Sequence, residues 1–400
     1  MELRTDGLRV GVVCHSGLGG SVRVAVGLAS TLARRGHDIR LFAKVLPLGA
    51  TRPASGVSFH GLHAPEPLHP HLHARWSSSD REAFIDLIVS VTESDALDVL
   101  HFHYAVPFAE IAARVGERLG SGCPRLVMTL HGTDVSTFGV DPVLGRGLRR
   151  ALGGLDAVTT VSNDHARLSA EVLRLNQLPE VIPNFVDVRR FRPGSVARAN
   201  GRALRRPPRI AHISNFRPVK DPESMARIFV HILREIEAEL WLVGDGDGMD
   251  PVRSILRKAR VEHHVRSFGL RRNVHRILRR SHVLLLTSRT ESFSLAALEA
   301  AACGVPVVAP RVGGLPEVVV DGTTGLLFEA GDEEEAAHAA LRLLADGDLR
   351  SLMGRAAAAR ARCFSTETIV ARYERLYREV LGAGGSSQSA ALGLPIGTAV

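Results

Sequence analysis

The feature that most constrains the fold of this chain is an alternation of short apolar segments with longer amphipathic stretches. Continuous apolar segments separated by amphipathic helices are typical of parallel strands that are buried on both faces of a sheet. The first group is Leu8–Cys14, Ile39–Ala43, Val99–Tyr104, Leu126–Leu130, Ala157–Val161 and Val181–Pro183. The second group is Ile210–Ile213, Leu240–Val243, Val265–Phe268, Val283–Thr287, Val305–Ala309 and Gly325–Phe328. Two such groups predict an α/β protein with two doubly wound, Rossmann-like domains.

The two groups are separated by a segment without periodicity, Arg192–Pro208, which is rich in proline, glycine and arginine. We therefore expect an N-terminal domain over residues 1–195 and a C-terminal domain over residues 209–364. With 400 residues, 45% of them hydrophobic, the chain can fill two cores. Residues 365–381 are expected to form a helix that packs back toward the N-terminal domain. Residues 382–400 carry no charge and are expected to be disordered.

The charge of the chain limits the classes of partner that it can bind. Lysine and arginine number 50 against 42 acidic residues, a net charge of +8, but only Lys44, Lys220 and Lys258 are lysines. The arginines are spread along the chain rather than gathered in one arm or helix, so nucleic-acid binding is not favoured. An anionic small substrate, or simply a solvated basic surface, explains this charge better.

The sequence also argues against export, membrane insertion and disulfide bonding. The first apolar segment, Leu8–Cys14, is too short for a signal peptide and continues into a glycine-rich motif. No stretch of about 20 apolar residues is present to span a membrane. The 4 cysteines are widely spaced and form neither CxxC pairs nor a disulfide framework. A reducing cytoplasm is therefore the expected location.

A glycine-rich motif, Cys14-His-Ser-Gly-Leu-Gly-Gly-Ser, follows the first predicted strand. A loop that joins a strand to a helix N-terminus can bind anions, because unpaired N–H groups and the helix dipole point at it. A dinucleotide-binding fingerprint would need glycine at Val22 and an acidic residue where the second strand ends, near Lys44. Hydride-transfer chemistry is thus not favoured, whereas an anion site and a plain tight turn both remain open.

Histidines gather near the ends of two predicted strands. His101 and His103 alternate along one strand and share a face, and His131 ends another strand and is followed by Gly-Thr-Asp. The three could be imagined as a metal site, but no carboxylate or cysteine completes a ligand set at the usual spacing, so no metal is expected. The strand end places His131 at the crevice where doubly wound sheets bind ligands. A core histidine or a simple turn is the alternative.

Two cations stand three residues apart in the stretch Ser214-Asn-Phe-Arg-Pro-Val-Lys, just after the first strand of the second group. Arg217 can bind a phosphate through two donors and Lys220 can act as a point charge, so the pair suits a diphosphate. A solvated basic loop is the alternative. The later stretch Val243–Gly248 resembles part of a calcium loop, but the twelfth position is Leu256 instead of glutamate, and this stretch predicts only a turn.

The most specific pattern is a pair of glutamates, Glu291 and Glu299, that lie eight residues apart. The first precedes a predicted helix and the second lies about two turns inside it, at roughly 5.4 Å per turn. The pair could therefore reach two ends of one ligand, while the backbone amides of Phe293–Leu295 hold a phosphate or a sugar hydroxyl between them. Either glutamate alone would be an ordinary exposed residue.

Together these motifs resemble those of the retaining family-four glycosyltransferases, whose GT-B fold has two Rossmann-like domains facing a central crevice. Within that family the chain looks similar to the N-acetylglucosaminyl-malate synthases of bacillithiol biosynthesis and, less closely, to the inositol-phosphate transferases of mycothiol biosynthesis. The likeness covers about residues 8–381. The stretches that carry it are His103-Tyr-Ala-Val-Pro, Leu130-His-Gly-Thr-Asp-Val, Asp141-Pro, Pro183-Asn-Phe-Val-Asp, Ser214-Asn-Phe-Arg-Pro-Val-Lys and the spaced glutamates.

The resemblance implies a nucleotide-sugar donor on the C-terminal domain and a small anionic acceptor on the N-terminal domain, with no metal or other cofactor. The residues that it implies for catalysis are His131, Arg217, Lys220 and Glu291. Those that it implies for donor binding are Gly19, Gly20, Asn215, Phe293, Ser294, Leu295 and Glu299. Those that it implies for acceptor binding are Ser21, Tyr104, Thr133 and Arg149.

The resemblance also implies individual roles for the charged residues and for the histidine. Glu299 binds the ribose hydroxyls, and Glu291 and the nearby backbone amides hold the donor sugar. Arg217 and Lys220 neutralise the leaving diphosphate, where developing negative charge needs stabilisation. His131 hydrogen-bonds the sugar near the reaction centre.

The implied reaction is retaining transfer of N-acetylglucosamine from UDP-GlcNAc to L-malate by a cytoplasmic enzyme, and the likeness is compatible with a homodimer. Two departures keep an alternative open. Ser294 stands where the family usually has glycine, and the histidine-rich segment His60–Ser79 is expected to form a loop over the acceptor side. The alternative is an antibiotic-biosynthesis enzyme that joins another UDP- or GDP-sugar to a small thiol or carboxylate. A nucleotide-sugar sensor without turnover is the non-enzymatic alternative, against which the intact set of charged site residues argues.

Overall fold

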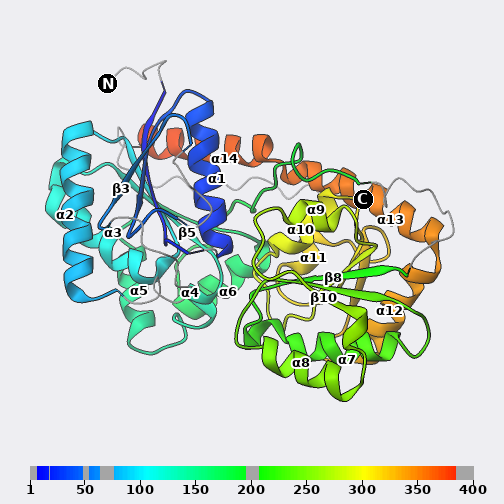
Figure 1. Ribbon diagram of the computed structural model, residues 1–400. Helices are drawn as coiled ribbons and strands as arrows, with labels where there is room; N and C mark the ends of the chain where they lie inside the picture. The colour runs from blue at the N-terminus through cyan, green and yellow to red at the C-terminus, as the bar shows by residue number, and fades with distance from the viewer. Residues whose placement is uncertain (1–6, 18, 48–53, 64–75, 195–206, 384–400) are drawn as a thin grey trace.

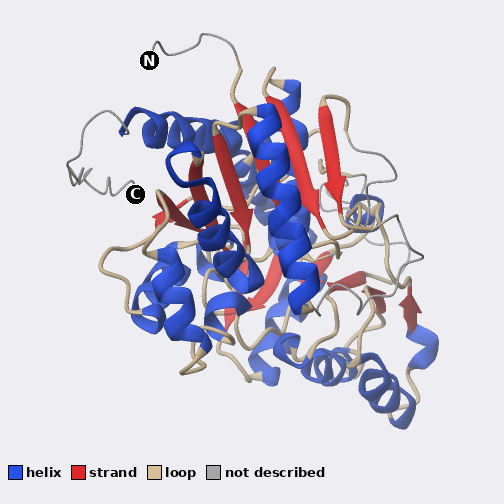
Figure 2. Cartoon of the chain, turned by 90° about the vertical axis from the view of Figure 1, so that its left-hand side faces the viewer, coloured by secondary structure: helices blue, strands red, loops and turns tan. Residues whose placement is uncertain are grey.

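The computed structural model describes residues 7–17, 19–47, 54–63, 76–194 and 207–383. In it the chain forms two parallel β-sheets, each with helices on both faces (Figure 1 and Figure 2). Parallel strands made of continuous apolar residues bury side chains on both sides of the sheet, which is why helices cover both faces. The predicted α/β class with two doubly wound halves is confirmed.

The N-terminal sheet has the strand order β3-β2-β1-β4-β5-β6-β7 and is parallel throughout. Its strands are β1 (Arg9–Val13), β2 (Asp38–Ala43), β3 (Val57–Gly61), β4 (Val99–His103), β5 (Arg125–Leu130), β6 (Ala157–Thr160) and β7 (Glu180–Val181). Its helices are α1 (Gly20–Arg34), α2 (Ser78–Asp95), α3 (Ala105–Leu119), α4 (Thr133–Ser136), α5 (Leu144–Leu152) and α6 (Asn163–Leu173). One core layer lies under α2, α3 and α5, and the other lies under α1.

The C-terminal sheet has the order β10-β9-β8-β11-β12-β13 and is also parallel. Its strands are β8 (Arg209–Ile213), β9 (Glu239–Val243), β10 (Val265–Ser267), β11 (Val283–Leu285), β12 (Val307–Pro310) and β13 (Gly325–Phe328). Its helices are α7 (Pro222–Ile232), α8 (Met249–Lys258), α9 (Val274–Leu278), α10 (Leu295–Ala302), α11 (Leu315–Val318), α12 (Glu333–Ala345) and α13 (Gly347–Ala361). Two apolar clusters, one on each face, form its core.

The last helix, α14 (Thr366–Gly382), returns to the N-terminal sheet and lies beside α1 (Figure 1). Its Tyr373 and Tyr377 are fully buried in the same apolar cluster as β1 and α1. The hydroxyl of Tyr377 lies 2.7 Å from Nδ1 of His101 on β4. Glu374 accepts hydrogen bonds from Arg35 at 2.5 Å and contacts His37 at 2.9 Å. The end of the chain is therefore part of the N-terminal core.

Removing the Tyr377 hydroxyl is expected to destabilise the fold by about 1–2 kcal/mol, because it leaves a buried ring nitrogen of His101 without its partner. Equilibrium unfolding of Tyr377→Phe against the wild type measures this. The double variant His101→Phe/Tyr377→Phe removes both partners, so it should cost less than the sum of the two single changes. Strict additivity would show that the contact contributes nothing.

The structure differs from the sequence-based expectations in three places. Strand β3 was not predicted, because only its first residue is buried and the continuous apolar pattern is missing. The sixth expected strand is the shorter β7. The expected loop His60–Ser79 is wrong at both ends, because His60 lies in β3 and Ser78 begins α2. The centre of that loop, residues 64–75, the centre of the expected linker and the expected disordered tail from residue 384 lie outside the described residues.

Candidate active site

A cleft with a volume of about 2370 Å³ lies between the two sheets. In each sheet the order of strands reverses beside the first strand, where β1 meets β4 and β8 meets β11. Doubly wound sheets bind ligands at the carboxyl ends of strands at such points. The predicted residues that line the cleft are Gly19, Gly20, Ser21, Tyr104, His131, Thr133, Asn215, Arg217, Lys220, Glu291, Ser294, Leu295 and Glu299. The structure thus brings together residues from both halves of the chain.

Lys220 and Glu291 form a charged pair on the C-terminal side of the cleft. Nζ of Lys220 donates to Oε2 of Glu291 at 2.5 Å, and the Ser288 hydroxyl donates to the same oxygen at 3.2 Å. The two charged side chains are only 21% and 13% exposed. A diphosphate that enters the cleft would therefore meet a lysine whose charge is already held in place by a carboxylate.

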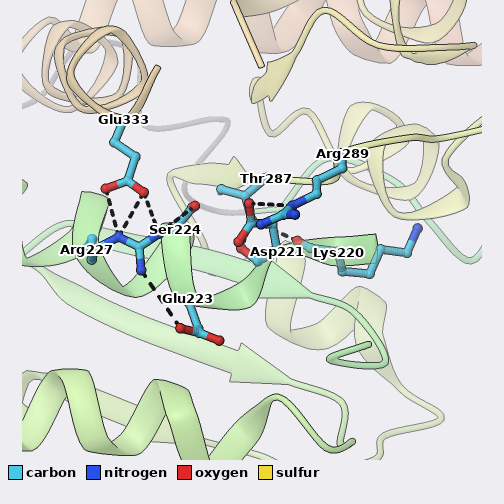
Figure 3. Close-up of polar contacts among 8 residues, drawn as sticks. All are labelled: Lys220, Asp221, Glu223, Ser224, Arg227, Thr287, Arg289 and Glu333. Atoms are coloured by element: carbon cyan, nitrogen blue, oxygen red, sulfur yellow. Dashed lines mark hydrogen bonds and ion pairs between the residues drawn. The ribbon is translucent and has the colours of Figure 1, made fainter. Parts of the chain in front are cut away.

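The loop that carries Lys220 is fixed by polar contacts, which Figure 3 shows. The Thr287 hydroxyl donates to the backbone carbonyls of Lys220 at 3.0 Å and Asp221 at 2.9 Å. The Arg289 guanidinium donates to the Asp221 carboxylate at 3.1 Å. On the next helix, Arg227 donates to Glu333 of α12 at 2.6 Å. The Lys220 side chain extends away from these contacts, so the loop is held without using its amine.

The stretch Val243–Gly248 packs closely against the backbone at the start of the same loop. Gly244 has φ +121°, and a Cβ there would lie 1.7 Å from the carbonyl oxygen of Ser214. This close approach explains the glycine, since any side chain would push the diphosphate loop away. The stretch is a turn after β9, as its sequence predicts. The imidazole of His212 on β8 lies 2.9 Å from the Ser214 hydroxyl, and burial lowers the pKa of His212 to about 4.

Glu299 is the most deeply buried charged group of the cleft, with 2% of its surface exposed. Its Oε1 is paired with the guanidinium of Arg23, which lies on α1 in the opposite half of the molecule. The side chain of Arg23 is 45% exposed, so the pair joins a buried carboxylate to a partly exposed guanidinium. Oε2 of Glu299 has no hydrogen-bond partner among the described residues. A buried carboxylate oxygen without a partner is suited to accept a hydrogen bond from a hydroxyl group of a ligand.

On the N-terminal side, His131 directly follows β5 and contacts a second histidine. Its Nε2 lies 3.1 Å from Nδ1 of His103, so one ring donates to the other. Burial holds the pKa of both rings well below the usual value, and both are therefore neutral at neutral pH. The Asp134 carboxylate accepts from the backbone N–H of His131 at 3.0 Å and of Gly132 at 2.7 Å. These bonds fix the turn in which His131 sits.

Tyr104 and Thr133 lie together at the part of the cleft that the resemblance assigns to the acceptor. Their hydroxyl oxygens are 2.5 Å apart. Burial, followed by the nearby Asp134 carboxylate, raises the pKa of Tyr104 to about 12, so its hydroxyl stays protonated at neutral pH. Ser21 belongs to the first turn of α1, at the glycine-rich loop. Three hydroxyl groups are thus available to a polar acceptor.

Two predicted residues do not line the cleft. Phe293 is 1% exposed and belongs to the core of the C-terminal domain, so it has only its backbone to offer a ligand. Arg149 lies on α5, where its Nε donates to the carbonyl of Leu173 at the end of α6, at 2.7 Å. The predicted contact of Arg149 with an acceptor would require its side chain to move.

Many residues of the cleft were not anticipated from the sequence, and three of them bear on the charged groups described above: Arg23, Arg81 and Ser292. Arg23 follows the glycine-rich loop by two residues, but it is one arginine among many and no pattern marks it. Ser292 stands between two predicted site residues, and its hydroxyl donates to the carbonyl of His131 at 2.6 Å. Only the fold brings these residues 161 positions apart into contact.

Within the part of the chain that the structure describes, no group of three or more His, Cys, Asp or Glu side chains is arranged to hold a metal ion. The three histidines weighed as ligands are included in that search. The described helices also include none that is both long and apolar enough to cross a membrane.

Ser294 adopts a backbone conformation that favours glycine. Its φ is +78°, it is 6% exposed, and its hydroxyl accepts from the N–H of Ala297 at 3.3 Å as the cap of α10. The positive φ gives a physical reason for the glycine that the family usually has here. The serine recovers part of the strain through the cap.

Ser294→Ala is therefore expected to cost about 1 kcal/mol, because the Cβ strain stays and the cap is lost. Ser294→Gly should leave stability within about 0.5 kcal/mol, because glycine relieves the strain and is a fair cap. Thermal unfolding of the two variants measures the difference. If the glycine variant proves the less stable of the two, strain at Ser294 is not the dominant effect.

Comparison with known protein families matches the two halves of the chain separately. Residues 18–190 match the family described as Glycosyltransferase Family 4, and residues 207–346 match the one described as Glycosyl transferases group 1. The N-acetyl-alpha-D-glucosaminyl L-malate synthase of Bacillus anthracis is 34% identical over 94% of this chain and 97% of its own length. The D-inositol 3-phosphate glycosyltransferase of Segniliparus rotundus is 27% identical over 92% of this chain and 86% of its own length.

Solved structures with the same fold cover nearly the whole molecule. A sucrose-phosphate synthase from Thermosynechococcus elongatus has a TM-score of 0.78 at 21% identity and covers 94% of this chain and 100% of its own. The Anabaena protein HepE, in complex with UDP and glucose, has a TM-score of 0.77 at 18% identity and covers 92% and 99%. At these identities the likeness establishes the fold, including the arrangement of two Rossmann-like halves.

Proposed function

The chain belongs to glycosyltransferase family 4, and from this premise we propose that it transfers N-acetylglucosamine from UDP-GlcNAc to L-malate with retention of configuration. It is a glycosyltransferase, and the identity of the two substrates is the proposal. The likeness to the malate synthase extends over nearly all of both chains, which supports the same substrate pair. We expect it to act in the cytoplasm on small molecules.

The observation that carries the proposal is the arrangement of a charged pair, a neutral histidine and a buried carboxylate around one cleft. Lys220 and Glu291 lie on one side and the neutral His131 on the other, and Glu299 offers an unpartnered oxygen further in. In the proposed reaction Glu299 accepts from a ribose hydroxyl, and Glu291 accepts from a hydroxyl of the sugar. Lys220 then contacts the diphosphate between them, and Arg217 stands at the open side of the same loop.

The proposed step breaks the bond between the anomeric carbon and the diphosphate oxygen and forms a bond from that carbon to the acceptor oxygen on the same face. The proton of the acceptor hydroxyl passes to the departing diphosphate. Negative charge grows on the diphosphate as the bond breaks, and fixed cations placed there lower the barrier. Lys220 meets this requirement because Glu291 and the Thr287 contacts hold its amine and its backbone in place before the donor arrives.

The acceptor end of the cleft suits a small hydroxy-carboxylate. Tyr104 and Thr133 supply hydroxyl donors, and Arg81, on the second turn of the domain's long helix α2, supplies a cation at the cleft wall. Arg149 is the cation that the family resemblance assigns to the acceptor. Comparing KM for malate in Arg81→Ala and Arg149→Ala decides which of the two contacts the carboxylate.

A second candidate is the use of a different sugar, and Ser294 favours it. Its side chain lines the cleft where the family usually carries glycine, so it reduces the space beside the donor sugar. Such an enzyme would transfer another UDP- or GDP-linked sugar to a small thiol or carboxylate in antibiotic biosynthesis.

One assay separates these candidates. UDP- and GDP-sugars are combined in turn with L-malate, an inositol phosphate and small thiols, and nucleoside diphosphate release is measured together with the mass of the product. The proposal expects UDP release from UDP-GlcNAc that depends on malate, and a product whose anomeric proton shows the α configuration. Malate-independent release, or faster turnover of another pair, would contradict it. The Lys220→Ala variant serves as the inactive reference.

A further inference from the structure

A set of polar contacts joins the two halves of the molecule beside the cleft. We call it the interdomain joint. From the N-terminal half it contains Ser162, Asn163 and Asp164, where β6 passes into α6, and from the C-terminal half it contains Ser292 and Glu317. Apart from Ser292, the residues of the joint belong to none of the sequence motifs and have no part in the proposed chemistry.

Glu317 binds the N-terminus of α6 across the domain boundary. Its Oε2 accepts from the backbone N–H of Asn163 at 3.0 Å and from the side-chain amide at 2.8 Å, and its Oε1 accepts from the N–H of Asp164 at 2.9 Å. The first N–H groups of a helix lack partners within the helix, and a negative charge there is favourable. Glu317 thus satisfies donors that α6 cannot satisfy itself.

The support of Glu317 within its own domain is rigid. Arg360 of α13 donates to the backbone carbonyl of Glu317 at 2.5 Å and to that of Val318 at 3.2 Å. The preceding Gly314 is packed so closely that a Cβ would lie 2.2 Å from the carbonyl oxygen of Ser292. Because its backbone is held in this way, the Glu317 carboxylate fixes the position of α6 relative to the C-terminal domain.

The joint ends at the reacting groups of both halves. The Ser162 hydroxyl accepts from the N–H of His165 at 3.0 Å as the cap of α6, and it donates to the carbonyl of Ser292 at 2.6 Å. The Ser292 hydroxyl donates in turn to the carbonyl of His131 at 2.6 Å. Ser292 is the neighbour of Glu291. Movement at the joint would therefore change the distance between Glu291 and His131.

We propose that Glu317 is a positioning residue, which holds α6 against the C-terminal domain and so keeps the Glu291 loop in register with His131. The inference rests on the proposed function only for its turnover readout, because the geometry itself does not depend on the substrates. Loss of the carboxylate should let the domains separate, while Lys220 and Glu291, which lie on one domain and pair with each other, keep their places.

The test compares Glu317→Ala, Glu317→Gln and a matched control, Glu334→Gln, which changes an exposed glutamate in the first turn of α12. Solution X-ray scattering measures the radius of gyration, calorimetry measures the affinity for UDP and for GDP, and the transfer assay measures kcat. We expect Glu317→Ala to have a larger radius of gyration and a kcat lower by on the order of tenfold. Its nucleotide affinity should stay within about twofold of the wild type. The glutamine, which keeps an accepting oxygen, should lie between.

The proposal is overturned if Glu317→Ala leaves either the radius of gyration or kcat at the wild-type value. It is also overturned if nucleotide affinity and the unfolding temperature fall together with kcat, because Glu317 would then be a folding residue. If the wild type proves inactive toward malate, the proposed acceptor fails but the scattering comparison still tests the joint. In that case kcat is measured with the donor and acceptor that the assay of sugar nucleotides and acceptors identifies.

Discussion

Replacing Lys220 by alanine is expected to lower turnover by about a hundredfold or more. The amine is held at 2.5 Å from Glu291 in a cleft wall with little exposure, so its charge is preorganised for a diphosphate. Removing one preorganised charge from such a site commonly costs this much. The expected signature is a fall in kcat under saturating donor, measured by nucleoside diphosphate release.

Two further variants make that result specific. Lys258→Ala removes another of the 3 lysines, from the exposed last turn of α8, and should leave turnover unchanged. Lys220→Arg keeps the charge but replaces a compact amine with a planar group, so it should recover only part of the loss. Near-normal turnover in Lys220→Ala would exclude the assigned role. A loss of folding in that variant, caused by the unpaired Glu291, would appear as a lower unfolding temperature.

Acidification from pH 7.5 to 5.5 is expected to lower the free energy of unfolding, and three buried histidines alone account for about 3–4 kcal/mol of this loss. In an unfolded chain a histidine titrates near pH 6.5. Burial lowers the pKa of His101 to about 3, of His212 to about 4 and of His282 to about 3. The unfolded state therefore binds more protons in this range, and each histidine contributes about 1 kcal/mol of loss. This stability is fully present above about pH 6.5 and is lost as the pH falls toward the folded values.

The two tryptophans allow the pH effect to be assigned to each half of the molecule. Trp76 lies at the N-terminal half and Trp241 in β9 of the C-terminal half, and each can be observed alone in the variant that lacks the other. Urea unfolding at the two pH values gives the loss for each domain. His101→Gln should reduce it in the N-terminal domain, whereas His263→Gln, on an exposed residue, should not. A pH-independent midpoint would contradict the assignment.

The fold was predictable because burial on both faces of a sheet leaves a local pattern in the sequence. A strand such as β4 is apolar at nearly every position apart from its histidines, so it is recognised without knowledge of its neighbours. Strand β3 lacks this pattern because it lies at the edge of its sheet and most of its residues are partly exposed. Its strand character comes from pairing with β2, which a local pattern does not contain.

The residues of the candidate site likewise fall into those with a local sequence pattern and those that depend on partners distant in the sequence. Lys220 and Glu291 could be identified because each belongs to a short motif with its own chemical logic. Arg23 and Glu317 could not, because their meaning depends on partners in the other domain, Glu299 and the N-terminus of α6. Arg149 is the reverse case: the family resemblance assigns it to the acceptor, while in the structure its Nε donates to the carbonyl of Leu173. Local motifs therefore point to single residues, and only the packing of the two domains shows which of these residues meet.

The return of α14 to the N-terminal sheet has a consequence for how the protein is made. Residues 366–382 complete a core whose first strand is Arg9–Val13, so nearly the whole chain must leave the ribosome before that core can close. The six described strands of the C-terminal sheet are consecutive in the chain, so this sheet can form as soon as its last strand has been synthesised. During translation the N-terminal domain therefore leaves the apolar surface that α14 later covers exposed to chaperones and to aggregation. A fragment that ends before α14 would keep that exposed surface permanently.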